Sequence, residues 1–216
     1  PADPLEAGDM VALLRRELRE PLTSIRGYAE LIADLVRDPD EMASLARIIH
    51  GEALHLAWLL EELALLERLS VGEVALHIRP TDLNSVAAEA ARRLGPETAG
   101  AVIALDLDAH LQPIPADRDA LLQLVTGLAR GALRGAGPGA VVRIMTTRSR
   151  RRALLSVSGG APVQDPRGLG LPIARGIARL HGGRAWAEGR PGGPVIRVAL
   201  PAVMPQARAA ASPPGT

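Results

Sequence analysis

The chain has no cysteine and very few aromatic residues. Its 216 residues include two Trp, one Tyr and no Phe. Without cysteine, disulfides, thiolate metal sites and cysteine nucleophiles are excluded. A core must therefore be built from Leu, Val, Ile and Ala, and a hydrophobic content of 47% is sufficient for one.

Neither sign of charge dominates, and no apolar run reaches membrane length. The 25 Lys+Arg and 24 Asp+Glu leave a formal net charge of +1, which disfavours a general nucleic-acid binder. We find no uninterrupted apolar span that would cross a bilayer and no signal peptide. Together with the absence of cysteine, these features predict a soluble, cytoplasmic chain.

Two long helical patterns follow a short lead-in. The first runs from about Asp9 to Arg37, and Pro21 interrupts its apolar seam, so we expect a bend there. The breaker Asp38-Pro39-Asp40 predicts a turn, after which a second helix runs from about Glu41 to Leu69. One hairpin cannot cover both of its apolar faces, which predicts that two copies pair into a four-helix bundle.

After the linker Ser70 to Glu73 the pattern becomes a mixture of strands and helices. We expect strands at Val74–Ile78, Ala101–Leu107, Val141–Met145, Ala153–Val157, Arg184–Glu188 and Val195–Leu200. We expect helices at Leu83–Leu94, Ala120–Leu133 and Ile173–Leu180. This order predicts an α/β sandwich with helices on one face of a sheet. The basic run Arg148 to Arg152 is interpreted as a solvated hairpin turn.

The stretch 15–28 reads RRELREPLTSIRGY, which resembles the phosphoacceptor helix of bacterial sensor histidine kinases, SHELRTPLTSIRGY. The resemblance places Arg16 where the family carries the phosphorylated histidine. A guanidinium stays protonated and cannot be the nucleophile that a neutral imidazole is. Glu17, which positions the histidine proton in the family, is retained with nothing to activate. Glu20 stands where the family carries the Thr or Asn used to dephosphorylate its partner.

The second half resembles the ATP-binding domain of the same family. The segments GLGLPI at 168–173 and HGGRAW at 181–186 are similar to the family's GLGLAI and HGGRIW. The helix predicted between Asp117 and Arg134 resembles the family helix whose two asparagines hold magnesium and phosphate. Here both asparagine positions are glycine, Gly127 and Gly131, which offer no side-chain oxygen to Mg²⁺.

The remaining nucleotide contacts of the family also differ. Gly159 replaces the aspartate that accepts a hydrogen bond from the adenine amino group in the family. Only residues 163–167 separate the segment 157–162, which contains Gly159, from Gly168. The resemblance therefore implies that the ATP lid is essentially deleted. We therefore expect no cofactor and no metal. The vestigial pocket would comprise Gly127, Gly131, Gly159, Gly168 and Gly170.

These observations predict an α+β chain of four parts. They are a lead-in at 1–9, a dimerisation and phosphotransfer-like hairpin at 10–70, a degenerate ATPase-like domain at 74–201 and a disordered tail at 202–216. The expected function is that of a catalytically inactive histidine-kinase-like protein, a pseudokinase, of a two-component system. It would bind a response-regulator receiver domain or an active histidine kinase, and it would itself form a homodimer.

The expected partner-binding residues lie on the first helix and are Arg16, Glu17, Arg19, Glu20 and Thr23. An alternative from the enzyme class is an ATP-independent phosphotransferase that uses His50 or His55, both on the second helix. The other three histidines have no neighbouring Asp, Glu or His spaced like a metal site, and we interpret them as structural.

Overall fold

The computed structural model describes residues 7–202 except positions 35, 37, 99, 135, 160–168 and 190–192, with side chains from residue 12 onward. The chain divides into two compact units. The first comprises Pro1–Val74 and Arg167–Gly176, and the second comprises Ala75–Pro166 and Ile177–Thr216.

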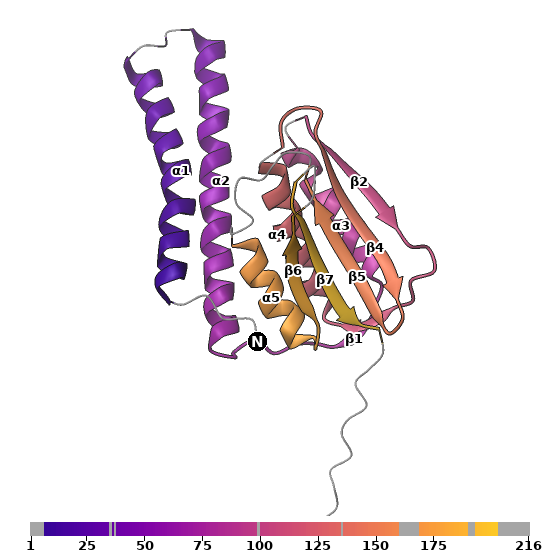
Figure 1. The fold of residues 1–216 in the computed structure, drawn as a ribbon. Helices are drawn as coiled ribbons and strands as arrows, with labels where there is room; N and C mark the ends of the chain where they lie inside the picture. The colour runs from indigo at the N-terminus through magenta and orange to yellow at the C-terminus, as the bar shows by residue number, and fades with distance from the viewer. Residues whose placement is uncertain are drawn as a thin grey trace, which may run out of the picture. The chain divides into compact units, whose positions relative to one another are not determined.

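The first unit contains an antiparallel helical hairpin (Figure 1). Helix α1 spans Ala7–Asp34 and helix α2 spans Pro39–Ser70. Asp38 caps α2, because its Oδ1 accepts hydrogen bonds from the amides of Asp40 at 2.8 Å and Glu41 at 3.4 Å. Pro39 takes the first helical turn, where its missing amide hydrogen costs nothing. The predicted turn between the helices is thus confirmed.

Helix α1 continues as one element through Pro21, whose side chain is buried. The expected bend at this proline stays a prediction. The buried face of α2 is formed by Leu59, Glu62, Leu65 and Leu69, at the spacing of three to four residues that keeps side chains on one side of a helix.

Other large apolar side chains of the hairpin remain accessible in the single chain. They are Leu22, Leu31, Met42, Ile48, Leu54 and Leu60. The most accessible of them, Leu54 and Leu60, are each 59% exposed. A hairpin with uncovered apolar side chains on both helices is what the sequence predicts for a module that pairs with a second copy.

The second unit is built on a five-stranded sheet with the order β2-β4-β5-β7-β6. Its strands are β2 (Val102–Leu107), β4 (Val141–Ser149), β5 (Arg152–Ser158), β6 (Arg184–Glu188) and β7 (Val195–Pro201). Strands β2 and β4 are parallel, and the other neighbours are antiparallel. A second, two-stranded sheet pairs β1 (Arg79–Thr81) with β3 (Ile114–Ala116).

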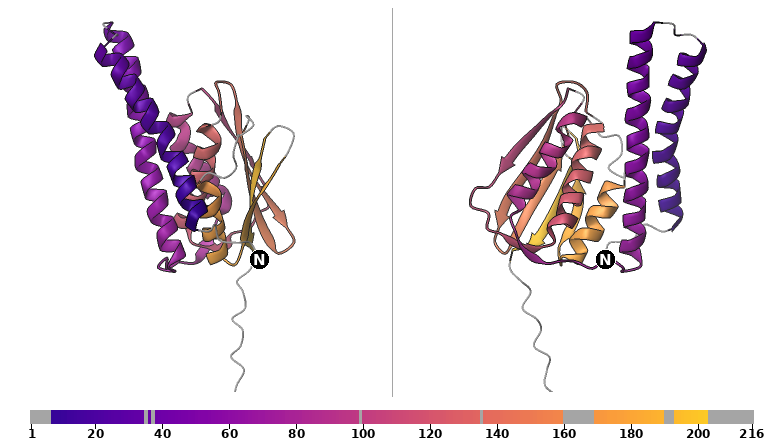
Figure 2. Two further views of the ribbon diagram at one scale, coloured as in Figure 1. Left: turned by 60° about the vertical axis from the view of Figure 1, so that its left-hand side comes forward. Right: turned by 180° about the vertical axis from the view of Figure 1, so that it is seen from behind.

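Helices cover one face of this sheet (Figure 2). They are α3 (Leu83–Leu94), α4 (Arg118–Arg134) and the last turn of α5 (Gly170–Leu180); a short 3₁₀ turn, η1 (Gly95–Glu97), follows α3. Alternate residues of β4 and β5, such as Ile144 and Leu155, are fully buried beneath the helices. The predicted sandwich is confirmed, and each helix and strand predicted from Leu83 onward is present.

The strand expected at Val74–Ile78 is wrong. Residues 73–78 have no regular structure, and pairing begins only at Arg79. The reason is visible at His77, whose amide donates to the side chain of Asp117 at 2.7 Å instead of to a neighbouring strand. Residues 74–78, whose sequence alternates like a strand, therefore form a linker that the Asp117 side chain holds in place. Strand β3, which the sequence analysis did not predict, is three residues long.

Strands β4 and β5 extend further than predicted and shorten the basic turn between them. Strand β4 continues to Ser149, and β5 begins at Arg152. Arg150 adopts a left-handed conformation with φ of 48°, as the tight connection requires. Three of the five residues predicted to form the turn therefore belong to strands.

Candidate functional site

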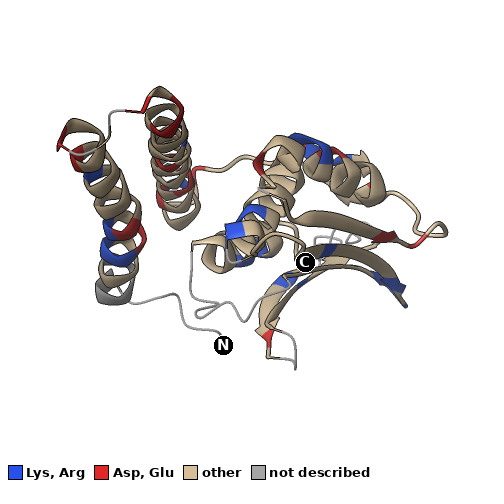
Figure 3. Ribbon diagram, turned by 90° about the horizontal axis from the view of Figure 1, so that it is seen from above, with Lys and Arg blue, Asp and Glu red and all other residues tan. Residues whose placement is uncertain are grey.

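A groove runs along α1 at the positions where the sequence resembles a phosphoacceptor helix. Its lining residues are Ala12, Arg15, Arg16, Arg19, Glu20, Thr23 and Ser24. Most of these positions are three, four, seven or eight residues apart, so the helical repeat of 3.6 residues brings them to one side. Figure 3 shows basic and acidic residues following one another along this helix.

The charge of the groove is positive. Three arginines against one glutamate give a net charge of +2 for the seven lining residues. Arg16 lies beside Glu17, with 3.3 Å between Nη2 and Oε1, and its side chain is 48% exposed. Arg15 and Arg19 are also exposed, and neither forms an ion pair within the part of the chain that the structure describes. The groove therefore presents guanidinium groups to solvent.

The structure brings together four of the five residues expected to bind a partner. Arg16, Arg19, Glu20 and Thr23 line the groove, whereas Glu17 lies beside it and contacts Arg16. The sequence analysis missed Ala12, Arg15 and Ser24. A helical projection would have found them, because each lies four residues from a predicted residue: Ala12 from Arg16, Arg15 from Arg19 and Ser24 from Glu20.

The two candidate histidines lie on α2, outside this groove. His50 is exposed. His55 is half-buried, and its ring lies against the indole of Trp58 with 5.4 Å between the ring centroids and 31° between the planes. The two side chains therefore occupy different environments, and solvent exposure favours His50 as the one that a phosphoryl donor would reach.

The glycines at the expected magnesium positions lie on α4 in the second unit. Gly127 is buried, whereas Gly131 is exposed and has no heavy atom within 4 Å of the position that a Cβ would occupy. The helix accommodates both glycines without interruption. A side chain at Gly131 would thus point into open space, whereas Gly127 is itself buried.

Gly159 follows β5 at a point where α4 lies very close. A Cβ at this position would stand 3.2 Å from the carbonyl oxygen of Ala132 and 3.3 Å from its Cβ. This distance is shorter than an ordinary van der Waals contact, so any larger residue requires a shift of α4. At Gly159, which the sequence analysis aligned with the family's adenine-binding aspartate, the backbone of α4 lies close to the chain that follows β5.

Of the other pocket positions, Gly170 begins α5. Gly168 and the shortened connection at 163–167 lie outside the described residues, so the deletion of the lid stays a prediction. Within the described ranges, no group of three or more His, Cys, Asp or Glu side chains is placed to hold a metal ion. No helix in the described part of the chain combines the length and the apolar character needed to cross a membrane.

Asp117 joins three segments of the second unit. Its carboxylate accepts backbone hydrogen bonds from His77 at 2.7 Å and from Asp119 and Ala120 at 3.0 Å, which caps α4. Its own amide donates to Nε2 of the buried His181 at 3.0 Å, and Nδ1 of that ring lies 2.8 Å from the carbonyl oxygen of Ile177. Both ring nitrogens are thus engaged, which supports the structural role expected for His181.

Electrostatics at this junction favour the ionised carboxylate. Burial raises the pKa of Asp117, but the hydrogen bonds from three backbone amides and the nearby His181 outweigh it, so the pKa lies below its ordinary value. A second carboxyl with a lowered pKa is Asp108, which accepts from the amides of His110 and Arg148 against a smaller effect of burial.

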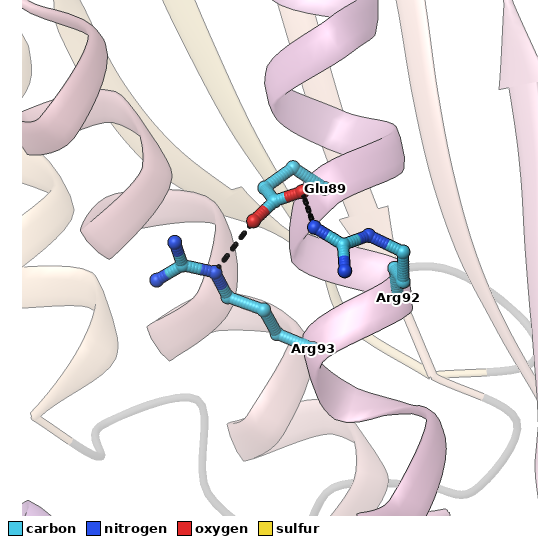
Figure 4. A network of polar contacts seen from close by, with 3 residues as sticks. All are labelled: Glu89, Arg92 and Arg93. Carbon is cyan, nitrogen blue, oxygen red and sulfur yellow. Dashed lines mark hydrogen bonds and ion pairs between the residues drawn. The ribbon is translucent and has the colours of Figure 1, made fainter.

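A surface cluster on α3 contains a third carboxyl group whose pKa is lowered by hydrogen bonds (Figure 4). Glu89 accepts a hydrogen bond from Arg92 and another from Nε of Arg93 at 2.8 Å. These two hydrogen bonds hold the pKa of Glu89 below its usual range. The cluster occupies one helical turn and lies outside the α1 groove.

A helical hairpin that carries a phosphoacceptor-like groove, followed by an α/β sheet unit, defines the histidine kinase class of architecture. Residues 6–72 match the family model of the His Kinase A (phospho-acceptor) domain. The chain is 30% identical over 217 residues to the probable sensor histidine kinase TcrY of Mycobacterium tuberculosis. This match covers 88% of the chain and 45% of TcrY, so the chain spans less than half the length of this relative.

Solved structures share the fold. The histidine kinase AdeS of Acinetobacter baumannii superimposes with a TM-score of 0.65 at 22% identity, over 87% of this chain and 98% of the AdeS chain. The histidine kinase ThkA, in complex with the response regulator protein TrrA, gives a TM-score of 0.64 at 22% identity, over 90% of this chain and 61% of the ThkA chain. Residues 6–72 thus belong to the His Kinase A domain family, and the chain is similar to sensor histidine kinases over most of its length.

Proposed function

We propose that this protein is a catalytically inactive member of the histidine kinase family, a cytoplasmic signalling protein that acts by binding. The observation that carries the proposal is Arg16, an exposed guanidinium on α1 at the position that corresponds to the phosphoacceptor histidine. A guanidinium has no free lone pair at working pH and cannot accept a phosphoryl group as a neutral imidazole does.

The second unit supports the same proposal independently. Gly127 and Gly131 offer no side-chain oxygen to magnesium, and Gly159 offers no side-chain acceptor to adenine. The close approach of Ala132 to Gly159 adds a steric reason, since an aspartate Cβ at this position would lie only 3.2 Å from the Ala132 carbonyl oxygen. Losses at the acceptor and at the nucleotide site remove two separate requirements of the kinase reaction.

The partner we propose is a receiver domain of a response regulator, or an active histidine kinase that pairs with the hairpin. Histidine kinase ThkA, which has the same fold, is found in complex with the response regulator TrrA. The groove on α1 offers polar and charged side chains for docking. The accessible leucines of the hairpin, above all Leu54 and Leu60, would become buried in a four-helix bundle formed with a second copy or with a kinase.

A second candidate function is phosphotransfer through α2. The exposure of His50 favours it over His55, whose ring lies against Trp58. Such a phosphotransferase would take the phosphoryl group from a phosphorylated receiver and would not need ATP. The two functions differ in whether the effect of the protein depends on an imidazole.

The experiment compares the wild-type chain with the variants H50A, H55A and H50A/H55A in cells that lack the native protein. If the protein acts by contact, all three variants retain the signalling output of the wild type. Loss of output in H50A, with correct folding shown by circular dichroism, would establish the phosphotransferase and overturn the binding function. Loss only in H55A would need a control at Trp58, because removing that imidazole also removes a packing contact.

A further inference from the structure

Two pairs of arginines in the α1 groove repel one another, whereas Arg16 and Glu20, four residues apart, carry opposite charges. Arg15 and Arg19 are four residues apart, and Arg16 and Arg19 are three apart, so like charges lie next to one another on the surface. Glu17 offsets part of this charge through its contact with Arg16. Nothing in the described hairpin neutralises Arg15 and Arg19, which indicates that the cluster serves a purpose other than folding.

Guanidinium groups are well suited to one particular ligand chemistry. Arginine presents several N–H donors in a planar fork and binds phosphate oxygens with two parallel hydrogen bonds. A phosphoryl group carries about two negative charges near neutral pH. The net charge of +2 on the seven lining residues is opposite in sign to the phosphoryl charge and similar in magnitude, so the two are complementary.

We propose that the α1 groove binds a receiver domain preferentially in its aspartyl-phosphate form, through the guanidinium groups of Arg15, Arg16 and Arg19. This inference rests on the proposed function, because it assumes that the groove is where a receiver docks. It adds that the protein distinguishes the phosphorylated regulator from the unphosphorylated one and withdraws the phosphorylated form.

Glu20 decides what happens to the phosphoryl group once it is bound. A carboxylate offers neither the hydroxyl nor the amide with which the family's residue at this position assists hydrolysis, and its charge disfavours close approach of the phosphate at this end of the groove. The three arginines lie N-terminal to it, within about one helical turn. The groove therefore holds an aspartyl phosphate without activating a water molecule against it.

The test measures the affinity of the full chain for the receiver domains of its source organism. Each purified receiver is titrated in two forms, with Mg²⁺ alone and with Mg²⁺ and beryllofluoride, which mimics the aspartyl phosphate. An exposed ion pair changes affinity by up to a factor of about five, so two or three arginines predict a preference of roughly tenfold for the beryllofluoride form in at least one receiver. Raising the salt concentration reduces this preference.

Two sets of variants connect the preference to the groove. R15A/R16A/R19A reduces the ratio of the two affinities to about one, whereas R15K/R16K/R19K keeps the charge and retains a measurable preference. The matched control is R26A, on the same helix but outside the groove, where Arg26 pairs with Glu30 at 3.8 Å. We expect R26A to leave the ratio unchanged. Circular dichroism of each variant verifies that the helices are intact.

The outcomes separate the two levels of the proposal. Binding of a receiver with equal affinity in both forms, or tighter binding of the unmodified form, overturns the phosphate preference and leaves receiver docking in place. A preference that persists in folded R15A/R16A/R19A overturns the assignment to these arginines. If no receiver binds in either form, receiver docking itself is wrong, and the preference is overturned with it.

Discussion

Replacement of Asp117 is expected to destabilise the second unit more than replacement of any other helix-capping aspartate. In D117A the cap of α4 is lost, which costs about 0.5–2 kcal/mol. The amide of His77, which donates to Oδ2 at 2.7 Å, also loses its acceptor, which adds about 1–3 kcal/mol where water does not replace it. We expect a decrease of about 2–4 kcal/mol in the free energy of unfolding.

The variant D117N divides this cost between the two oxygens. Oδ1 accepts from Asp119 and Ala120, and Oδ2 accepts from His77. An asparagine can keep the cap with its amide oxygen but turns an NH₂ group towards the His77 amide. D117N is therefore expected to lose only the second contribution, about 1–3 kcal/mol.

The assay is urea unfolding followed by tryptophan fluorescence in a W58F background. Trp58 belongs to the hairpin, so its removal leaves Trp186 on β6 as the reporter of the second unit. The matched control is D82A, since Asp82 caps α3 through one hydrogen bond to the amide of Asn84 at 2.9 Å and is exposed. If D117A costs no more than D82A, the reasoning about the buried junction is refuted.

The pH dependence provides an independent check. Because the pKa of Asp117 is lowered by folding, its ionised form stabilises the protein fully above the unfolded pKa of about 3.9. That stabilisation is lost as the pH falls through the lower, folded pKa. The difference in stability between wild type and D117N should therefore shrink below a pH of about 4. A constant difference down to pH 3 would contradict the assigned hydrogen bonds.

Three further predictions use other parts of the chain. G131A should raise the free energy of unfolding by about 0.5–1 kcal/mol, because the added methyl group enters open space on a helix. G159A should not raise the free energy of unfolding, because its Cβ would approach the Ala132 carbonyl oxygen to 3.2 Å. L54S/L60S should shift the protein from dimer to monomer in light scattering, because both leucines are 59% exposed in the single chain. T146V should cost about 1–3 kcal/mol, because it removes a hydroxyl that donates to Asn84 at 2.6 Å.

Each of these predictions has a control. G131A and G159A serve as controls for each other, and equal effects would contradict the described packing. Val71, which is 61% exposed beyond the end of α2, supplies V71S, which should leave the dimer intact. Thr126 has a buried hydroxyl with no hydrogen-bond partner among the described residues. T126V should therefore be neutral or stabilising, and a loss equal to that of T146V would refute the role given to the Thr146 hydroxyl.

The sequence predicted most of the regular elements because their patterns are local. The helical periodicity of α1 and α2 and the breaker at Asp38 each depend on residues that are close in sequence. Three of the four observed helix ends lie within two residues of the predicted ones. The strands predicted at Arg184–Glu188 and Val195–Leu200 lie within one residue of the observed bounds, and they pair as β6 and β7.

Features that depend on distant partners were not predictable in this way. The segment 74–78 alternates like a strand, but the acceptor of its His77 amide is Asp117, forty residues later. Strand β3 has three residues and exists only because β1 pairs with it. In the candidate site, the family resemblance indicated Arg16, Arg19, Glu20 and Thr23, but Arg15 and Ser24 emerged only from the groove itself.

The most direct test of the central claim is a search for acid-labile phosphate on the purified protein after exposure to labelled Mg-ATP or to a phosphorylated receiver domain. An active kinase of the same family serves as the positive control. We predict no label with either donor, together with measurable binding of a receiver domain. Label from Mg-ATP at any position would show that the kinase reaction is retained, and label on His50 or His55 from the receiver would make the protein a phosphotransferase, so either result would contradict a function by contact alone.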